Sequence, residues 1–147
     1  MRISAKGEYA IKAMLDLAMH HARPLVPIQE IAVRQAIPQR YLEQVLLALK
    51  RSGLLTSKRG ATGGYHLTRL PEEITVGAVL RAVDGGSAPF EAGRGGGSGA
   101  YSHDLGELWE EIADAVTGVV DRWTLDDLVA RTTARPRIHP AHVSHLE

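Results

Sequence analysis

The 147-residue sequence contains no cysteine, and only 5% of its residues are aromatic. Without a thiol the chain can form no disulfide, no thiolate zinc site and no cysteine-ligated iron–sulfur cluster. No apolar run approaches the roughly 20 residues that a helix needs to cross a bilayer. The charged residues in the first segment are also unlike a signal peptide. We therefore expect a cytoplasmic protein without a membrane partner.

Charge is distributed unevenly, although the formal net charge is zero. Residues 1–70 contain 11 lysines and arginines against 4 acidic residues, a balance of +7, whereas residues 71–147 contain 6 against 13, a balance of −7. A basic half followed by an acidic half is expected if only the first half meets nucleic acid. The length allows one compact domain plus an extension.

Two helices joined by a tight link are predicted in the basic half. The first spans residues 28–35, and the second runs roughly from Pro38 to Ser52, where Gly53 ends it. The second helix has an apolar face at i, i+3, i+4 and i+7 spacing, made of Leu42, Val45, Leu46 and Leu49. Its opposite face carries Arg40, Gln44, Leu47 and Arg51, with Glu43 at the edge. Arginine, glutamine and glutamate can hydrogen-bond base edges, so this face is a candidate for reading DNA.

A glycine-rich β-hairpin is predicted next. Residues 54–57 and 65–68 are strand-like, and the turn between them holds Gly60, Gly63 and Gly64. Lys58 and Arg59 place two cations at this thin tip, which suits a phosphate backbone or a minor groove. Helix, turn, helix and hairpin is the order of a winged helix-turn-helix. The sequence therefore predicts a DNA-binding module.

Further helices are predicted on both sides of this module. Ser4 caps a first helix that runs to about His20 or His21, and another helix lies near residues 75–83. A long helix runs from Asp104, as its cap, to about Trp123, and a short one from Leu125 to Arg131, capped by Thr124. The long helix carries a near-heptad apolar stripe of Leu105, Leu108, Trp109, Ile112, Val116, Val119, Val120 and Trp123. We expect this stripe to pair with a second copy of the chain; packing back on its own chain is the alternative.

The chain is thus expected to be mainly α with a small β-hairpin wing and a long dimerisation helix. We expect a winged helix-turn-helix domain over residues 1–84, a flexible glycine-rich loop over 85–102, dimerisation helices over 103–133 and a flexible tail over 134–147. In the tail, His139, His142 and His145 recur every third residue, but two nearby prolines oppose the helix that would bring them together. No metal site and no cofactor is predicted.

Four motifs together are specific: MRISAKGEYA at residues 1–10, AMLD at 13–16, YLEQ at 41–44, and GL at 53–54 leading to RGATGGY at 59–65. They resemble the bacterial winged helix-turn-helix regulators that include IscR, NsrR and CymR, in a cysteine-free form. The resemblance covers nearly the whole chain. It implies a homodimer whose second helix-turn-helix helix enters the major groove and whose wing meets the minor groove. The candidate DNA-binding residues are Arg2, Ser4, Lys6, Gln39, Arg40, Tyr41, Glu43, Gln44, Ser57, Lys58, Arg59, Gly63, Gly64 and Tyr65.

The loop before the long helix departs from the pattern of this family. Many members carry three cysteines there that hold an iron–sulfur cluster, whereas this loop is filled with glycine, serine and alanine. As it stands, the sequence resembles the cluster-free members, which respond to small metabolites or partner proteins. We expect a homodimeric repressor of an imperfect palindrome, and no enzyme, because no catalytic arrangement stands out. The alternatives are a cluster sensor whose cysteines were mutated and a winged-helix protein-interaction module.

Overall fold

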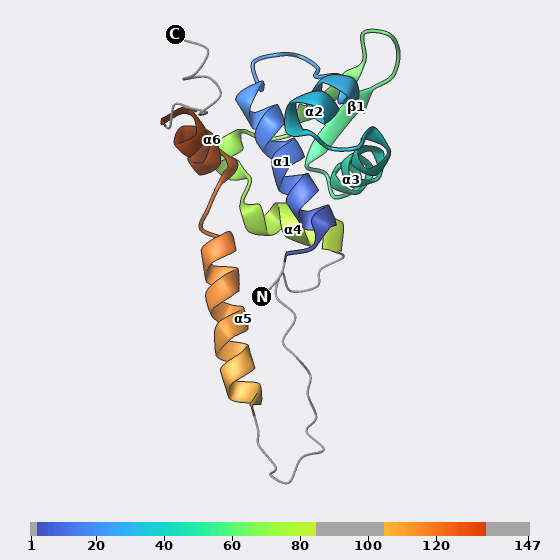
Figure 1. Cartoon of the computed structure of the whole chain (residues 1–147). Coiled ribbons are helices and arrows are strands. Elements are labelled where there is room, and N and C mark those ends of the chain that lie inside the picture. Colours follow the sequence, from blue (N-terminus) through green and yellow to red (C-terminus); the bar gives the residue numbers. More distant parts are fainter. Residues whose placement is uncertain (1–2, 85–104, 135–147) are drawn as a thin grey trace, which may run out of the picture.

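A helical unit with a β-hairpin wing and one protruding helix make up the part of the chain that the computed structural model describes, residues 3–84 and 105–134 (Figure 1). The elements in chain order are α1 (Ala5–Met19), α2 (Ile28–Gln35), α3 (Gln39–Arg51), β1 (Leu55–Lys58), β2 (Gly64–Leu67), the 3-10 helix η1 (Pro71–Glu73), α4 (Val76–Asp84), α5 (Gly106–Val120) and α6 (Leu125–Ala134). The predicted class, mainly α with a two-stranded wing, is confirmed.

Local signals place the first helices as predicted. The Ser4 hydroxyl accepts a hydrogen bond from the Gly7 N–H at 3.0 Å, so Ser4 is the N-cap of α1. The α2 helix has the predicted bounds. The α3 helix begins at Gln39, and Pro38 occupies its N-cap position. Gly53 follows α3 with φ at 82°, a left-handed conformation that glycine adopts without strain.

The wing is an antiparallel pair in which Leu55 faces Leu67 and Lys58 faces Gly64. Both strands lie one residue nearer the turn than the predicted runs, because Lys58 pairs with Gly64 there. At the other end of the ladder, the Thr68 N–H donates to Leu54 O at 3.1 Å. Val26, in the link between α1 and α2, adds a further pairing: its N–H and C=O exchange two 2.9 Å hydrogen bonds with Tyr65. The wing is therefore attached through β2 to the link between α1 and α2.

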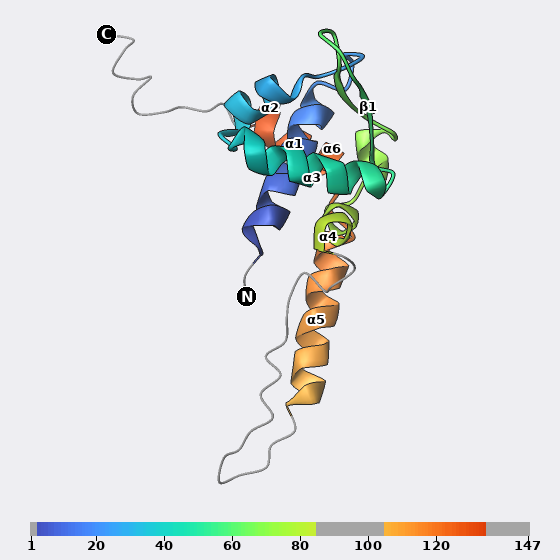
Figure 2. The same ribbon diagram turned by 90° about the vertical axis from the view of Figure 1, so that its right-hand side faces the viewer.

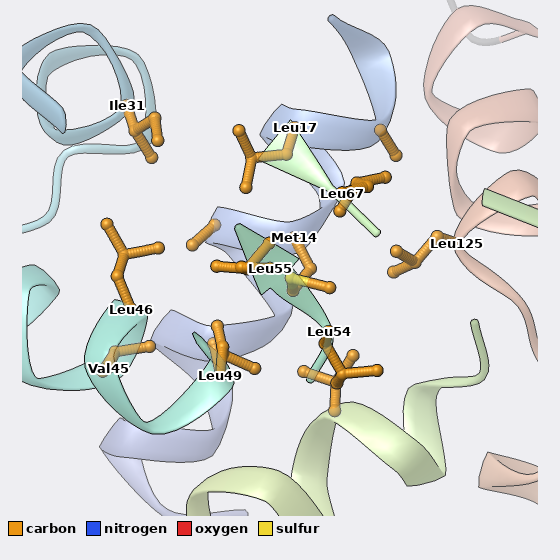
Figure 3. Packing of buried hydrophobic residues seen from close by; sticks show 14 of the residues in the cluster. Met14, Leu17, Ile31, Val45, Leu46, Leu49, Leu54, Leu55, Leu67 and Leu125 are labelled. Atoms are coloured by element: carbon orange, nitrogen blue, oxygen red, sulfur yellow. The ribbon is translucent and has the colours of Figure 1, made fainter. Parts of the chain in front are cut away.

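The core lies where α1, α3 and the wing converge (Figure 3). Met14 and Leu17 of α1 meet Leu46 and Leu49 of α3, and all four side chains are buried. The apolar face predicted for α3 is confirmed by the burial of Leu42, Val45, Leu46 and Leu49. Burial of this face leaves the opposite side of α3 free to face outward.

The C-terminal helices differ from expectation at their ends. The α5 helix follows Leu105 without a side-chain cap, and it stops at Val120, not near Trp123. It ends early because the Trp123 carbonyl accepts the Val76 N–H at 2.8 Å, beside a β-bridge between Thr75 and Thr124. Thr124 caps α6 as predicted, in a reciprocal pair with Asp127 at 2.9 and 3.1 Å.

The last helix packs against the winged unit, by which we mean α1 to α4 together with the wing. The α6 helix continues past the predicted end at Arg131 to Ala134, packs on α1 and η1, and buries Leu125 completely. The α6 helix, which falls in the predicted dimerisation segment over residues 103–133, thus contacts α1; the domain division stays a prediction. Asp104, the predicted loop over 85–102 and the tail histidines lie outside the described residues.

Candidate DNA interface

The turn between α2 and α3 sets the crossing of these helices. Ala36 has φ at 52°, a left-handed conformation that reverses the chain within one residue. The next residue, Ile37, is buried, and its N–H donates to Ala32 O at 3.0 Å. The turn therefore holds the N-terminal end of α3 at the surface, where α3 can reach a groove of DNA.

A buried carboxylate fixes α2 on α1. Asp16 is 1% exposed, and it accepts hydrogen bonds from Arg34 Nε at 2.9 Å, Arg34 Nη2 at 3.0 Å and Gln35 Nε2 at 3.1 Å. Glu30 extends the cluster by accepting from Arg34 at 2.9 Å and from Arg23 at 2.8 and 2.9 Å. We call these residues, Asp16, Arg23, Glu30, Arg34 and Gln35, the α1–α2 clamp.

Hydrogen bonding in the clamp stabilises the charged forms. The hydrogen bonds from Arg23 and then from Arg34 lower the pKa of Glu30 to about 2. The hydrogen bonds to Asp16 raise the pKa of Arg34 above its usual value. Because these charges satisfy one another, the clamp acts as a support that orients the helix-turn-helix and is itself no ligand site.

The outward side of α3 carries polar residues that have no role in the core. Gln39, Arg40, Glu43 and Gln44 are all exposed. Tyr41 is 57% exposed, and its ring is positioned by Tyr9, whose centroid lies 6.3 Å away at a tilted angle. These five candidate residues thus form one continuous polar face along the first turns of the helix, with two carbonyl-bearing amides, a cation, a carboxylate and a phenol.

The wing stands beside this face, and a groove of about 450 Å³ separates the two. Glu43, Leu47 and Lys50 of α3 line one wall, and Ser57, Lys58 and Arg59 of the wing line the other. Tyr65 also lines the groove. Burial raises the pKa of its hydroxyl, and the Glu43 carboxylate raises this pKa further. Figure 2 shows the wing projecting at the end of the unit opposite α5.

Two candidate glycines have structural reasons to be glycine. A Cβ on Gly64 would come within 2.5 Å of Val26 O, and one on Gly63 would come closer still to Lys58 O. Gly64 is also buried, so the close approach of Val26 accounts for the residue type. Contact of Gly63 and Gly64 with a DNA backbone stays a prediction.

A second groove, of about 420 Å³, lies between α1 and α3 and brings Lys6 together with Tyr41 and Gln44. Lys6 is exposed there, next to the polar face of α3. The other candidate on α1, Ser4, uses its hydroxyl as the helix cap and donates to Asp84 at 3.3 Å. Arg2 lies outside the described residues.

Lys50 and Leu47 also line the groove; Leu47 was placed on the candidate face of α3 but not among the candidate DNA-binding residues, and Lys50 was in neither set. Lys50 Nζ donates to Ser57 Oγ at 2.7 Å, which joins α3 to the wing, and Leu47 is exposed. Leu47 follows Glu43 by four residues and Lys50 follows it by seven, and this spacing keeps all three on one helix face. That spacing was the available signal for including them.

The predicted dimerisation stripe lies along α5 without cover from the rest of the described chain. No residue of α5 is buried; Leu105, Leu108 and Val119 are exposed, and Trp109, Ile112, Val116, Val120 and Trp123 are half-buried. At the base of the helix Arg81 pairs with Asp121 at 2.8 Å. The Arg131 guanidinium lies 4.3 Å from the centre of the Trp123 ring.

Two absences hold for the described residues alone. Among residues 3–84 and 105–134, no group of three histidine, aspartate or glutamate side chains could hold a metal ion. The helices in these ranges are also too short or too polar for any of them to span a membrane.

Comparison with known proteins gives a consistent picture. The sequence model of the Rrf2 family, described as an iron-dependent transcriptional regulator, matches residues 3–131. The HTH-type transcriptional regulator IscR of Pectobacterium carotovorum subsp. carotovorum (strain PC1) is 42% identical over 130 residues, which cover 88% of this chain and 79% of that protein. Among solved structures, T. potens IscR matches with a TM-score of 0.74 and 33% identity, covering 97% of this chain and 96% of that one. The global cysteine regulator CymR of B. subtilis matches with a TM-score of 0.74 and 34% identity, over 89% and 98%.

Proposed function

The chain belongs to the Rrf2 family of transcriptional regulators, and on that premise we propose that it is a homodimeric repressor that reads an imperfect palindrome. DNA-binding transcriptional regulation follows from the family, whose members here are named regulators and not enzymes. The finer statements, the dimer, the operator symmetry, repression and action in the cytoplasm, are our proposal.

One observation carries the proposal of sequence-specific reading. Glu43 of the exposed α3 face and the wing cations Lys58 and Arg59 line one groove. Arg40 and Gln44 are exposed on the same helix. Side chains of the Arg40, Glu43 and Gln44 types discriminate base edges, and lysine and arginine on the wing supply affinity for phosphate. A face with both kinds of group in this order suits a major groove and the adjacent minor groove.

Selection of genomic fragments tests the proposal. Wild type, Arg59→Ala and the control Arg69→Ala, which removes a cation at the wing base outside the groove, are each mixed with sheared DNA from the source genome at moderate salt. We expect wild type and Arg69→Ala to retain fragments that share a palindrome, and Arg59→Ala to lose them. Equal, unselective retention by all three would instead favour a protein-interaction module.

The exposed stripe of α5 supports the proposed dimer. An apolar helix face of this length that the described part of the chain leaves partly exposed is stabilised when a second copy covers it. Ile112→Glu places a charge in the middle of the stripe, and Glu111→Gln is a control on the adjacent exposed position. Sedimentation equilibrium should give a monomer for Ile112→Glu and a dimer for wild type and the control. A wild-type monomer would contradict the proposal.

Control without an iron–sulfur cluster is the last part of the proposal. The family description names iron dependence, but this sequence supplies no thiolate, and the described residues offer no cluster of metal ligands. The residues therefore do not fit an iron–sulfur centre, and we propose a small molecule or protein partner as effector. It would act by changing the separation of the two DNA-reading units. If footprints of the protein on DNA show the same half-site spacing with and without every tested effector, this mechanism is contradicted.

A further inference from the structure

We propose that Lys50, together with Ser57, forms a binding site for one phosphate of the DNA strand that separates the major groove from the minor groove. This inference rests on the proposed mode of DNA binding and adds a contact outside the predicted site. It begins from the hydrogen bond between Lys50 Nζ and Ser57 Oγ at 2.7 Å, which crosses the groove between α3 and the wing.

The position of Lys50 follows from the path of the DNA strand. A protein that places one element in the major groove and another in the adjacent minor groove must straddle the sugar–phosphate backbone between them. In this structure the space between the two elements is the groove of about 450 Å³ lined by Lys50 and Ser57. Lys50 lies seven residues after Glu43, or about 10 Å farther along the helix, on the side nearest the wing strand β1.

The charge of Lys50 is available for an anion. Within the described part of the chain, no carboxylate forms an ion pair with Lys50, Lys58 or Arg59, whereas Arg23 and Arg34 of the α1–α2 clamp are fully engaged with carboxylates. Three unpaired cations around one groove attract a polyanion, and Lys50 is also exposed.

The hydrogen-bonding capacity of the pair matches a phosphate. An ammonium has three donors, and Lys50 uses one of them for Ser57. Ser57 accepts that bond and keeps its own O–H for donation to a phosphate oxygen. Because the long lysine side chain is already tethered, it loses less rotamer freedom when it binds. Ser57 was predicted to meet the DNA backbone, and the tether makes Lys50 part of the same contact.

Salt dependence of binding tests the site with three variants. Lys50→Gln removes the charge, Ser57→Ala removes the tether but keeps the charge, and Arg69→Gln removes a cation outside the groove. Affinity is measured by fluorescence anisotropy at a series of salt concentrations on the selected palindrome and on a shuffled duplex of equal length. A variant that has lost one phosphate contact shows a slope of log K against log salt reduced by about 1.

We expect Lys50→Gln to lose roughly four- to eightfold in affinity near 0.1–0.2 M salt, with the reduced slope on both duplexes. Ser57→Ala should weaken binding with the wild-type slope, and Arg69→Gln should match wild type. An unchanged slope in Lys50→Gln would overturn the proposal, because the bond between Lys50 and Ser57 would then only hold the wing. An equal change in Arg69→Gln would also overturn it, by showing a general charge effect.

The shuffled duplex separates this proposal from the proposed function. If wild type does not prefer the palindrome but Lys50→Gln still reduces the slope on both duplexes, sequence-specific reading fails and the phosphate site stands. If wild type prefers the palindrome and Lys50→Gln keeps its slope, the phosphate site fails alone. If wild type binds neither duplex, both fail.

Discussion

The winged unit and α5 use similar apolar residues in opposite environments. In the winged unit, Leu42 and its neighbours on α3 are fully buried, and Asp16, the one charged residue that is buried among the described residues, is hydrogen-bonded. On α5, Leu108 is 48% exposed and Val119 is 46% exposed, and the helix stands away from the unit (Figure 1). The winged unit is therefore stabilised by its own contacts, whereas the stability of α5 depends on what covers it. Four substitutions test this comparison, in order of decreasing expected effect.

The largest effect is expected from Asp16→Asn in the α1–α2 clamp. The neutral amide leaves the Arg34 guanidinium with Glu30 as its one remaining carboxylate partner in the clamp, and removing one member of a buried pair is strongly destabilising. Because the Arg34 side chain is 31% exposed, we discount the usual cost and expect a loss of about 2–3 kcal/mol of unfolding free energy. Urea denaturation followed by circular dichroism measures it, with Glu8→Gln, at the surface pair with Lys12, as control. A loss within about 0.5 kcal/mol would show that the clamp carries little stability.

A somewhat smaller effect is expected from Gly64→Ala. The added methyl group would collide with the Val26 backbone, and overpacking of this kind costs about 1–3 kcal/mol. Thermal unfolding should show a lowered midpoint, and DNA binding should fall because the wing base shifts. If stability is unchanged but DNA binding is lost, Gly64 acts through DNA contact and the structural explanation is wrong.

Glu30 should make the stability of the winged unit depend on pH. Its carboxyl pKa is lowered in the folded chain from 4.5 to about 2, so the folded state favours the charged form. This contribution is fully present above about pH 4.5 and is lost as the pH falls toward 2. Urea midpoints at pH 6, 4 and 3 for wild type and Glu30→Gln should converge as the pH falls. A difference that stays constant over this range would contradict the assignment.

The smallest effect is expected from Gly118→Ala on α5. No atom lies within 4 Å of the added Cβ, and alanine favours a helix over glycine by up to about 1 kcal/mol. We therefore expect slightly higher helicity and an unchanged dimer, measured by circular dichroism and sedimentation. Dissociation of the dimer would place Gly118 inside the interface and move the contact face off the predicted stripe. Together with Gly64→Ala, this variant compares the effect of one added methyl group at a buried position of the winged unit and at an exposed position of α5.

Local signals in the sequence were sufficient for most elements of the fold. Ser4 and Thr124 identified the starts of α1 and α6, and the apolar spacing of Leu42 and Leu46 identified the buried side of α3. These features depend on residues within a few positions of one another, where backbone and spacing rules apply directly. For the same reason the exposed face of α3 and the cationic wing tip were recognised as candidates.

Contacts between distant residues were not predictable. Asp16 and Arg34 are 18 positions apart, and nothing in the periodicity of α1 distinguishes a buried aspartate from an exposed one. Nothing near Gly64 in the sequence indicates that Tyr65 pairs with Val26, so the close approach of the Val26 backbone to Gly64 was not predictable. The early end of α5 likewise depends on the hydrogen bond between Trp123 and Val76. In each case the partner lies far along the chain, and only the packed fold brings it close.

The attachment of α5 at one end has a mechanical consequence. The helix is held at its base by the Arg81–Asp121 pair and the Thr75–Thr124 bridge, and its 15 residues extend about 22 Å from there. Tilting such a rod by about 10° at the base moves its far end on the order of 4 Å, more than the 3.4 Å that separates successive base pairs. A small displacement at Asp121 would thus be magnified through the lever arm of α5 and, in the proposed dimer, would change which base pairs the two units reach.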